Sequence, residues 1–355
     1  MIAVPPTGWP TVDAVFSPGT DEAYIRDVIA QSADGSNFLF LNGQHDLLGP
    51  IELHGSDKSI FGQSKQAIIN NKAGIAINIS GSGHYVHDLR IQSEFEINPG
   101  SLIRVNSFVG LSQTTFERCE FFQNRQGSPI FDNVLGEVTE VRFRDCYGRH
   151  HLDATVPSWH FMDSVAGTGS ERKVTLVLFD GYRHLYSGDY AFKIESVDSS
   201  TTGPNCVTLR NVNFERCPGG LVHAVGCRCL LLEQAWVGDF DPAVKKIHKH
   251  LIRLEGTTDE HTQFSTGRIC GITMGESDDS YEAGIKDISI GSSAPDKAAP
   301  VILENLQTQP SKGKKIRANF NGCVGIEETN CMIFDREGYE HVVRSGMGKL
   351  AIGAF

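Results

Sequence analysis

The feature that most constrains this fold is a short pattern that recurs along almost the whole chain. An apolar stretch meets one polar residue and then continues as apolar–x–apolar, as in HYVHDLRI at 84–91 and CVTLRNVNF at 206–214. Most copies are separated by 23 to 37 residues, a period that indicates an array of stacked units. We call the polar residue of each copy the corner residue. The corner residues are Asp57, Asp88, Arg118, Asp145, Asp180, Asn211, Gln234, Gly271, Asn305 and Asn330.

A second apolar strand follows most corners by about 11 to 18 residues, as in SLIRVNS at 101–107 and YAFKIESV at 190–197. A hairpin meander would join its strands through loops of two to five residues. Two short strands per period fit one coil of a parallel β-solenoid better, because each coil then stacks on the one before it. Roughly ten coils at the ~4.8 Å spacing of neighbouring strands would form a rod about 50 Å long.

The residue directly after eight of these corners, from Asp88 onward with Asp180 excepted, is small or medium-sized and apolar, as at Leu89, Cys119, Cys146 and Val212. In a solenoid this column points inward and accounts for several of the nine cysteines without any chemistry. An odd number of cysteines with no CxxC pairs favours buried thiols over a disulfide framework or a metal site. We expect no metal and no cofactor.

The two ends of the array need covering, because an open coil exposes apolar core. Residues 21–35 are expected to form an amphipathic capping helix, with Tyr24, Ile25, Val28 and Ile29 on one face. Residues 1–20, which contain four prolines, are expected to form an extended N-terminal arm. The β-helix is expected over 36–335 and a C-terminal cap or tail over 336–355.

Composition excludes several classes of function. The formal net charge of −11 argues against a nucleic-acid binder, which would carry a basic excess. No apolar run reaches the roughly 18 residues of a membrane span. The first residues, MIAVPPTGWP, lack the basic and apolar segments of a signal peptide, so synthesis in a cytoplasm is expected.

The stretch SIFGQSKQAIINNKAGIAINISGSGHYVHDLRI at 59–91 and the corner residues Asn211, Asn305 and Asn330 carry a family resemblance. The chain resembles the pectin-lyase-like superfamily of right-handed, single-stranded parallel β-helices, which includes polysaccharide lyases, glycoside hydrolases and bacteriophage tailspikes. The resemblance implies an all-β fold and, for spikes, a homotrimer. The NTD, GHG and RxK motifs of the polygalacturonase branch are missing, as are the pectate lyase signatures. The resemblance therefore implies architecture rather than a particular activity.

One candidate site is a column of basic residues on the second strand of successive coils. If the coils stack in this register, the side chains would form an outward row with steps near 5 Å. Aligned like charges repel, so the column needs compensation. Either Glu195 and Glu255 supply it internally or a bound polyanion, such as an acidic glycan, supplies it. A solvated face or a subunit contact is the alternative. The residues of the column are Lys193, His223, Arg253, Lys286 and Arg317.

Aromatic residues suggest further sugar contacts. The segment 181–195 carries Tyr182, Tyr186 and Tyr190 beside Asp189 and Glu195, a candidate platform for a sugar ring. The stretch DCYGRHHLDATVPSWHFMD at 145–163 adds three histidines and Trp159, which suit acid–base chemistry or stacking on a sugar. Ordinary packing within a loop is the alternative for both segments.

Glycoside hydrolysis needs two carboxyl groups about 5 Å apart for retention, or about 6.5–9.5 Å apart for inversion. Stacking would bring the corner residues Asp145 and Asp180 near the shorter distance. Asp189 and Glu195 are the other candidate catalytic carboxylates. Corner residues can instead bond to the backbone of the turn, which would leave Asp145 and Asp180 without a catalytic role.

Three functions follow from these patterns. The first is a bacteriophage virion spike, fibre or decoration protein that binds host cell-surface polysaccharide and contacts other virion proteins through its N-terminal arm. The second is a depolymerase, either a hydrolase or a lyase, on the same scaffold. The third is a purely structural capsid or tail component.

Overall fold

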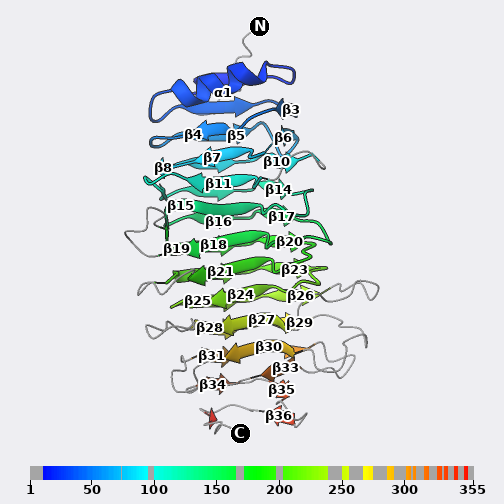
Figure 1. Ribbon diagram of the computed structural model, residues 1–355. Coiled ribbons are helices and arrows are strands. Elements are labelled where there is room, and N and C mark those ends of the chain that lie inside the picture. The colour runs from blue at the N-terminus through cyan, green and yellow to red at the C-terminus, as the bar shows by residue number, and fades with distance from the viewer. Residues whose placement is uncertain are drawn as a thin grey trace.

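The computed structural model describes residues 11–72, 74–94, 100–164, 172–196, 203–238, 250–255 and 267–274. Beyond residue 274 it describes strand backbones only, and the side chains of residues 250, 251, 273 and 274 are also outside the description. Short strands lie one above another in a tall stack that runs from the N-terminus to the C-terminus (Figure 1). Strands of successive coils pair in parallel, as β13 does with β16, β14 with β17 and β18 with β21. The expected parallel β-helix is therefore confirmed.

Three parallel sheets form the sides of the stack. Sheet 2 is the one with ten strands. Its strands are β3 (Gly43–Leu47), β6 (Ala67–Asn71), β10 (Arg90–Ser93), β14 (Glu120–Phe122), β17 (Tyr147–Arg149), β20 (Arg183–Leu185), β23 (Asn213–Glu215), β26 (Trp236–Gly238), β29 (Thr273–Met274) and β32 (Gln307–Thr308).

Sheet 3 precedes sheet 1 in each coil, and the long strand β15 (Phe131–Thr139) belongs to both. The other strands of sheet 3 are β4 (Ile51–Leu53), β7 (Ile77–Ile79), β11 (Ile103–Asn106), β18 (Trp159–Asp163), β21 (Phe192–Ser196), β24 (Val222–Val225), β27 (His250–Glu255), β30 (Lys286–Gly291) and β33 (Ile316–Asn319).

Sheet 1 follows sheet 3 and leads into the corner. It contains β1 (Ala14–Phe16), β2 (Asn37–Phe40), β5 (Ser59–Gly62), β8 (Gly81–Ser82), β9 (Tyr85–His87), β12 (Leu111–Ser112), β13 (Thr115–Glu117), β16 (Arg142–Arg144), β19 (Arg172–Asp180), β22 (Asn205–Arg210), β25 (Leu230–Glu233), β28 (Gly267–Cys270), β31 (Val301–Glu304) and β34 (Ile326–Thr329).

The two ends differ from the expected segments. Within the predicted arm, β1 pairs in parallel with β2, so residues 14–16 already belong to the stack. Near the C-terminus, β37 (Gly348–Leu350) pairs antiparallel with β34, and β36 (Glu340–Val342) pairs antiparallel with β35 (Met332–Phe334). Residues 336–355 therefore contribute strands rather than only a tail.

Helix α1 (Glu22–Gln31) lies across the N-terminal end of the stack (Figure 1). The side chain of Asp21 accepts a hydrogen bond from the Ala23 N–H at 2.9 Å and so caps the helix. Ile25 and Ile29 are fully buried in the core of the first coils. Tyr24, which the sequence pattern placed on the same face, is 58% exposed.

The corners turn the chain from sheet 1 into sheet 2 through left-handed backbone. Asp57, Asp88, Arg118, Asp145, Asn211 and Gln234 have φ between 51° and 57°, and Gly271 has φ 65°. In the remaining described coil the corner is Gly181 (φ 68°) rather than Asp180. Asn305 and Asn330 lie outside the described residues.

The interior follows from the apolar column after each corner. Leu89, Cys119, Cys146, Val212, Ala235 and Ile272 are at most 2% exposed, as is Tyr182 after the corner at Gly181. Cys119, Cys146, Cys206, Cys217 and Cys229 are free thiols. Buried aromatic rings stack in the middle coils, where Phe143 lies 4.8 Å from Phe116 and 4.4 Å from Phe179 between ring centroids.

Candidate functional site

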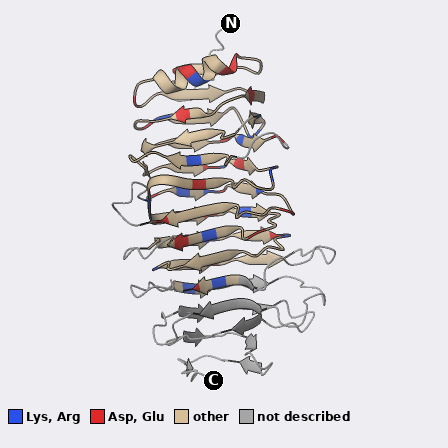
Figure 2. Cartoon of the chain, viewed as in Figure 1, with Lys and Arg blue, Asp and Glu red and all other residues tan. Residues whose placement is uncertain are grey.

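A row of polar side chains runs down the outer face of sheet 3. The pairing of successive strands places one residue of each coil in the same register. Figure 2 shows charged segments on successive strands of this face. We call this set the sheet-3 row; it consists of Glu52, Asn78, Arg104, Asp132, His160, Lys193, His223 and Arg253.

Two glutamates of the same chain neutralise the basic residues of this face, which was one of the two alternatives for the charge of the basic column. Glu195 and Glu255 lie two residues beyond Lys193 and Arg253 on β21 and β27. Glu195 binds the Lys193 Nζ at 2.8 Å and His160 Nε2 at 2.6 Å. Glu255 contacts Arg253 and binds His223 Nε2 at 2.8 Å. Each cation or imidazole from His160 to Arg253 therefore has a carboxylate partner.

The carboxyl groups of this face have divergent pKa values. Burial alone would raise the pKa of Glu195, but hydrogen bonds from His160 and Lys193 outweigh burial and lower this pKa to about 2. Asp132 lies two coils earlier and is 7% exposed. Burial raises the pKa of Asp132, against the opposing charge of Arg104, whose Nη2 lies 3.1 Å from Asp132 Oδ2. A buried oxygen of Asp132, Oδ1, has no hydrogen-bond partner in the described part of the chain.

The predicted basic column is right for three residues and wrong for two. Lys193, His223 and Arg253 are neighbours in register. Arg253 pairs next with Ser289, whereas Lys286 pairs with His250. Ser289 then pairs with Asn319, two residues beyond Arg317. The register differs from the predicted one because Ile252 pairs with Ile288 and Leu254 pairs with Ile290. The residue between these two isoleucines, Ser289, therefore occupies the position that the sequence pattern assigned to Lys286.

The predicted aromatic platform is mostly part of the core. Trp159 and Tyr182 are fully buried, and the Trp159 Nε1–H donates to the Tyr182 hydroxyl at 2.6 Å. Tyr190 is 3% exposed, and its ring centroid lies 5.1 Å from that of His223. Tyr190 thus supports the sheet-3 row from beneath rather than offering a face to a sugar.

Tyr186 is half-buried and follows β20 of sheet 2, so it is not part of the sheet-3 row. The Arg149 guanidinium lies 5.4 Å from the centre of its ring and that of Arg216 lies 5.9 Å from it. These two cation–π contacts compete with any sugar that would stack on this ring.

The candidate corner carboxylates hold turns between coils. Asp145 occupies a left-handed corner, and its N–H donates to the Asp180 carbonyl at 2.9 Å. Asp180 accepts hydrogen bonds from Arg210 at 2.5 Å and Asn211 at 2.9 Å, and the bond from Arg210 lowers its pKa. Asp189 accepts from the Tyr190 N–H at 2.7 Å in the turn before β21. Among the four candidate carboxylates, Glu195 contacts His160 and Lys193 of the sheet-3 row.

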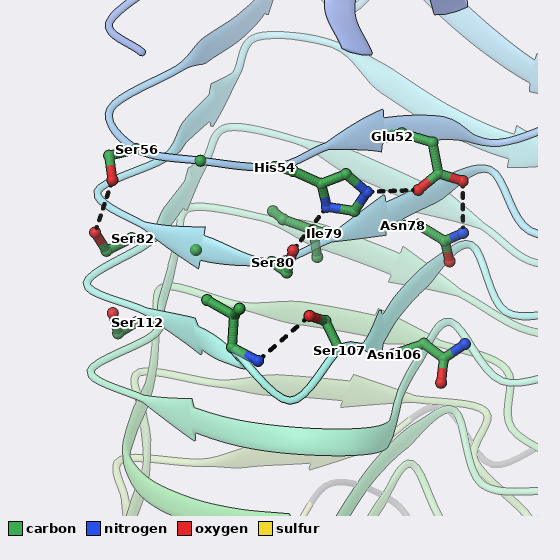
Figure 3. Close-up of a pocket in the computed structure, with 13 residues that line it drawn as sticks. Glu52, His54, Ser56, Asn78, Ile79, Ser80, Ser82, Asn106, Ser107 and Ser112 are labelled. Atoms are coloured by element: carbon green, nitrogen blue, oxygen red, sulfur yellow. Dashed lines mark hydrogen bonds and ion pairs between the residues drawn. The ribbon is translucent and has the colours of Figure 1, made fainter. Parts of the chain in front are cut away.

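An open groove of about 680 Å³ lies at the N-terminal end of the sheet-3 row, where β4, β7 and β11 end. Figure 3 shows His54 between Glu52 and Ser80, with hydrogen bonds to both. Asn106, Ser107 and Val109 line the opposite wall. The groove therefore shares Glu52 and Asn78 with the row.

The sequence patterns did not predict the groove residues or Asp132. A short repeat in the sequence nevertheless indicates the groove. The segment IELHGS at 51–56 is repeated as INISGS at 77–82, a spacing of 26 residues. The repeat stacks His54 beside Ser80 and Ser56 beside Ser82. Gly81 is required at this point, because a Cβ there would lie 1.8 Å from the Gly55 carbonyl oxygen.

Among the residues that the structure describes, no three His, Cys, Asp or Glu side chains cluster as metal ligands. The described helix is too short and too polar to cross a membrane.

Comparison with known proteins identifies the class of fold. No protein-family model and no curated protein sequence matches the chain. The surface protein and adhesin PfbA of Streptococcus pneumoniae is similar in structure over 90% of this chain and 92% of its own, with 12% identity and a TM-score of 0.60. Together with the strand pairing, this likeness identifies the fold as a parallel β-helix.

Two further solved structures match less closely. Endo-xylogalacturonan hydrolase from Aspergillus tubingensis matches with 10% identity and a TM-score of 0.46, over 96% of this chain and 99% of its own. Tailspike protein 3 of bacteriophage CBA120 matches with 13% identity and a TM-score of 0.42, over 93% of this chain and 57% of its own.

Proposed function

We propose that this protein binds a cell-surface polysaccharide along the sheet-3 row. The observation that carries the proposal is the unbroken register of polar side chains from Glu52 to Arg253, in steps of about 4.8 Å. A linear polymer of sugars presents hydroxyl pairs at regular intervals. Carboxylate, imidazole, guanidinium and amide groups can all hydrogen-bond to such pairs.

The charge balance of the row favours a hydroxyl-rich ligand over a polyanion. Glu195 and Glu255 already neutralise Lys193 and Arg253. A polyanion would compete with these internal partners, whereas uncharged hydroxyl groups can bond to the outer edges of the ion pairs. The fold is compatible with adhesion, since PfbA is described as an adhesin.

Retention on a glycan array, followed by affinity measurement on the best ligand, tests the proposal. The double variant Lys193→Ala/Arg253→Ala should weaken binding at least tenfold. The matched control is Arg183→Ala/Arg210→Ala, which removes two ion-paired cations from sheets 2 and 1. Equal affinity of both double variants and the unaltered protein would refute binding along the row.

Depolymerisation on the same face is the second candidate function. The pKa of Asp132 is raised and that of Glu195 is lowered. Two carboxyl groups whose pKa values are shifted apart in this way can serve as a general acid and a general base. Polysaccharide that binds should then be cut, with release of reducing ends for a hydrolase or unsaturated products for a lyase. Binding that persists while Asp132→Asn abolishes product release would establish this function. Binding without any cleavage would exclude it.

We also propose that the protein works as a spike, fibre or decoration protein of a bacteriophage virion. Five described cysteines, Cys119, Cys146, Cys206, Cys217 and Cys229, are free thiols, as suits synthesis in a reducing cytoplasm. Trimer assembly and contacts of the N-terminal segment with other virion proteins are part of this proposal. Light scattering of the purified protein would test the trimer, and the protein content of purified particles would test virion association.

A further inference from the structure

The groove contains a hydroxyl, an imidazole and a carboxylate connected in series. The Ser80 hydroxyl lies 2.6 Å from His54 Nδ1. On the other side of the ring, His54 Nε2 lies 2.8 Å from Glu52 Oε2. The second carboxylate oxygen, Glu52 Oε1, accepts a hydrogen bond from the Asn78 amide at 2.8 Å. With the proton on Nε2 donated to Glu52, Nδ1 is the nitrogen that accepts the proton of Ser80.

Neighbouring polar groups of the stack show what a purely structural role looks like. Ser56 and Ser82 form a simple hydroxyl pair at 3.4 Å in the adjacent column of the groove. His84 is fully buried and bonds to the Ser80 backbone carbonyl at 2.9 Å. His54 differs from both, because its side chain is 49% exposed and joins a hydroxyl to a carboxylate. A nucleophile, its base and a group that orients the base form the arrangement of serine hydrolases.

The groove also provides room for a substrate at this hydroxyl. Ser80, His54 and Glu52 all line the cavity of about 680 Å³ (Figure 3). Val109 is 76% exposed and forms an apolar edge that suits an acyl group. Asn106 is exposed on the same wall, and its side-chain amide makes no hydrogen bond within the described ranges. This amide is a hydrogen-bond donor on the groove wall.

We propose that this groove is a serine esterase site that removes acyl groups from esterified sugar hydroxyls. The Ser80 Oγ attacks the ester carbonyl carbon while His54 Nδ1 takes the hydroxyl proton. The resulting tetrahedral oxyanion collapses, the bond from carbon to the sugar oxygen breaks, and His54 returns the proton to that oxygen. Water, deprotonated by His54, then attacks the acyl–Ser80 ester and releases the carboxylic acid and the Ser80 hydroxyl.

The position of the groove relates the ester to the proposed polysaccharide. Glu52 and Asn78 belong both to the relay and to the N-terminal end of the sheet-3 row. A chain of sugars lying along the row would therefore carry its acyl substituents past Ser80. The assignment of a polysaccharide as the acyl carrier rests on the proposed function, whereas hydrolysis of a small ester does not.

The experiment uses the full chain with p-nitrophenyl acetate and with a fluorophosphonate probe. The protein should show a burst of p-nitrophenol, and the probe should label the peptide that contains Ser80. Ser80→Ala should lower kcat/KM at least a hundredfold and abolish labelling. Ser112→Ala is the matched control, because Ser112 lines the same groove on the next coil and should leave both readouts unchanged. Absence of labelling in the unaltered protein, or labelling that survives Ser80→Ala, would overturn the proposal.

Glu52 acts through His54, so its variant needs a different readout. Glu52→Gln keeps the shape of the side chain and should lower kcat at least tenfold with little change in KM. An unchanged kcat would contradict the relay, and urea unfolding shows whether each variant is folded. The control variant Arg183→Ala/Arg210→Ala, which changes neither the row nor the groove, should retain hydrolysis of the small ester. If the unaltered protein hydrolyses the small ester but binds no glycan, the row is refuted. If it binds glycan but hydrolyses no ester, the groove proposal is refuted.

Discussion

Two groups of histidines in neighbouring coils have opposite environments. His150 and His184 lie inside the stack, at most 2% exposed. His160 and His223 lie on the outer face of sheet 3 and bind Glu195 and Glu255. Ten residues of chain separate His150 from His160. The difference teaches that the direction of the side chain, rather than proximity in sequence, decides whether a histidine of this fold lies in the core or on the outer face of a sheet.

The interior histidines belong to a continuous hydrogen-bonded chain. Trp159 donates to Tyr182, whose hydroxyl lies 2.8 Å from His184 Nδ1. The Ser158 hydroxyl lies 3.2 Å from His184 Nε2 and 3.1 Å from His150 Nδ1. His150 Nε2 then lies 2.9 Å from the Ser128 carbonyl oxygen. Each donor finds an acceptor when both imidazoles are neutral, so the chain is a structural element of the core.

The largest expected effect is acid destabilisation through the interior pair. Burial lowers the pKa of His150 to about 4 and that of His184 to about 3, with the charge of His150 lowering the latter further. The unfolded chain therefore binds more protons below about pH 6.5, and stability falls as the pH falls. From pH 7.5 to 5.0 these two groups should cost about 4 kcal/mol of unfolding free energy, measured by urea titration. His45 and His84, whose pKa values burial also lowers, add in the same direction.

The variant His184→Gln sharpens this prediction, because glutamine donates and accepts hydrogen bonds without titrating. It should reduce the loss by about 2 kcal/mol between the same two pH values. A free energy of unfolding that stays level from pH 7.5 to 5.0 in the unaltered protein would contradict neutral interior histidines.

A smaller effect is expected from breaking the interior chain at Tyr182. The substitution Tyr182→Phe leaves the Trp159 N–H and His184 Nδ1 without a partner inside the core, which should cost about 2 kcal/mol. Tyr186→Phe is the matched control four residues away and should cost less than about 0.5 kcal/mol, because Tyr186 is half-buried at the surface. Equal losses of unfolding free energy for the two variants in urea titration would show that the buried hydrogen bonds of Tyr182 do not stabilise the protein.

The smallest effect on stability is expected on the outer face. His160→Ala removes a partner of Glu195 near the surface and should change the unfolding free energy by less than about 1 kcal/mol. Binding of the polysaccharide should weaken about tenfold, which corresponds to about 1.4 kcal/mol. His151→Ala, in the loop before β18, should alter neither quantity. A large loss of stability with unchanged polysaccharide binding would show that His160 stabilises the fold, as His150 and His184 do, and does not bind the ligand.

The fold can be predicted from the sequence because each coil repeats the same short pattern of a corner residue followed by an inward-pointing residue. The corner pattern predicts residues such as Arg118 and Gln234, which adopt left-handed backbone despite their side chains. It also predicts that the following residue points inward, as Cys119 and Ala235 do. The corner is misassigned at Asp180 because both Asp180 and Gly181 suit a turn. That shift by one residue made the buried Tyr182 look like a surface aromatic.

The site is harder to predict because it depends on register across variable loops. Lys193, His223 and Arg253 come from coils whose strands align with little irregularity, and their column is confirmed. The register beyond Arg253 depends on where β30 begins, which the loop sequence does not indicate. The segment at 145–163 contains buried residues, such as His150 and Trp159, and outward ones, such as His160. Only the three-dimensional path of the chain separates the two kinds.

A row assembled from one residue per coil has the properties of a ruler. Insertion or duplication of a single coil would lengthen the row by one strand spacing and leave the other residues of the row in the same register. The length of the proposed binding surface can therefore change by the gain or loss of whole coils, while the contacts within the remaining coils stay the same.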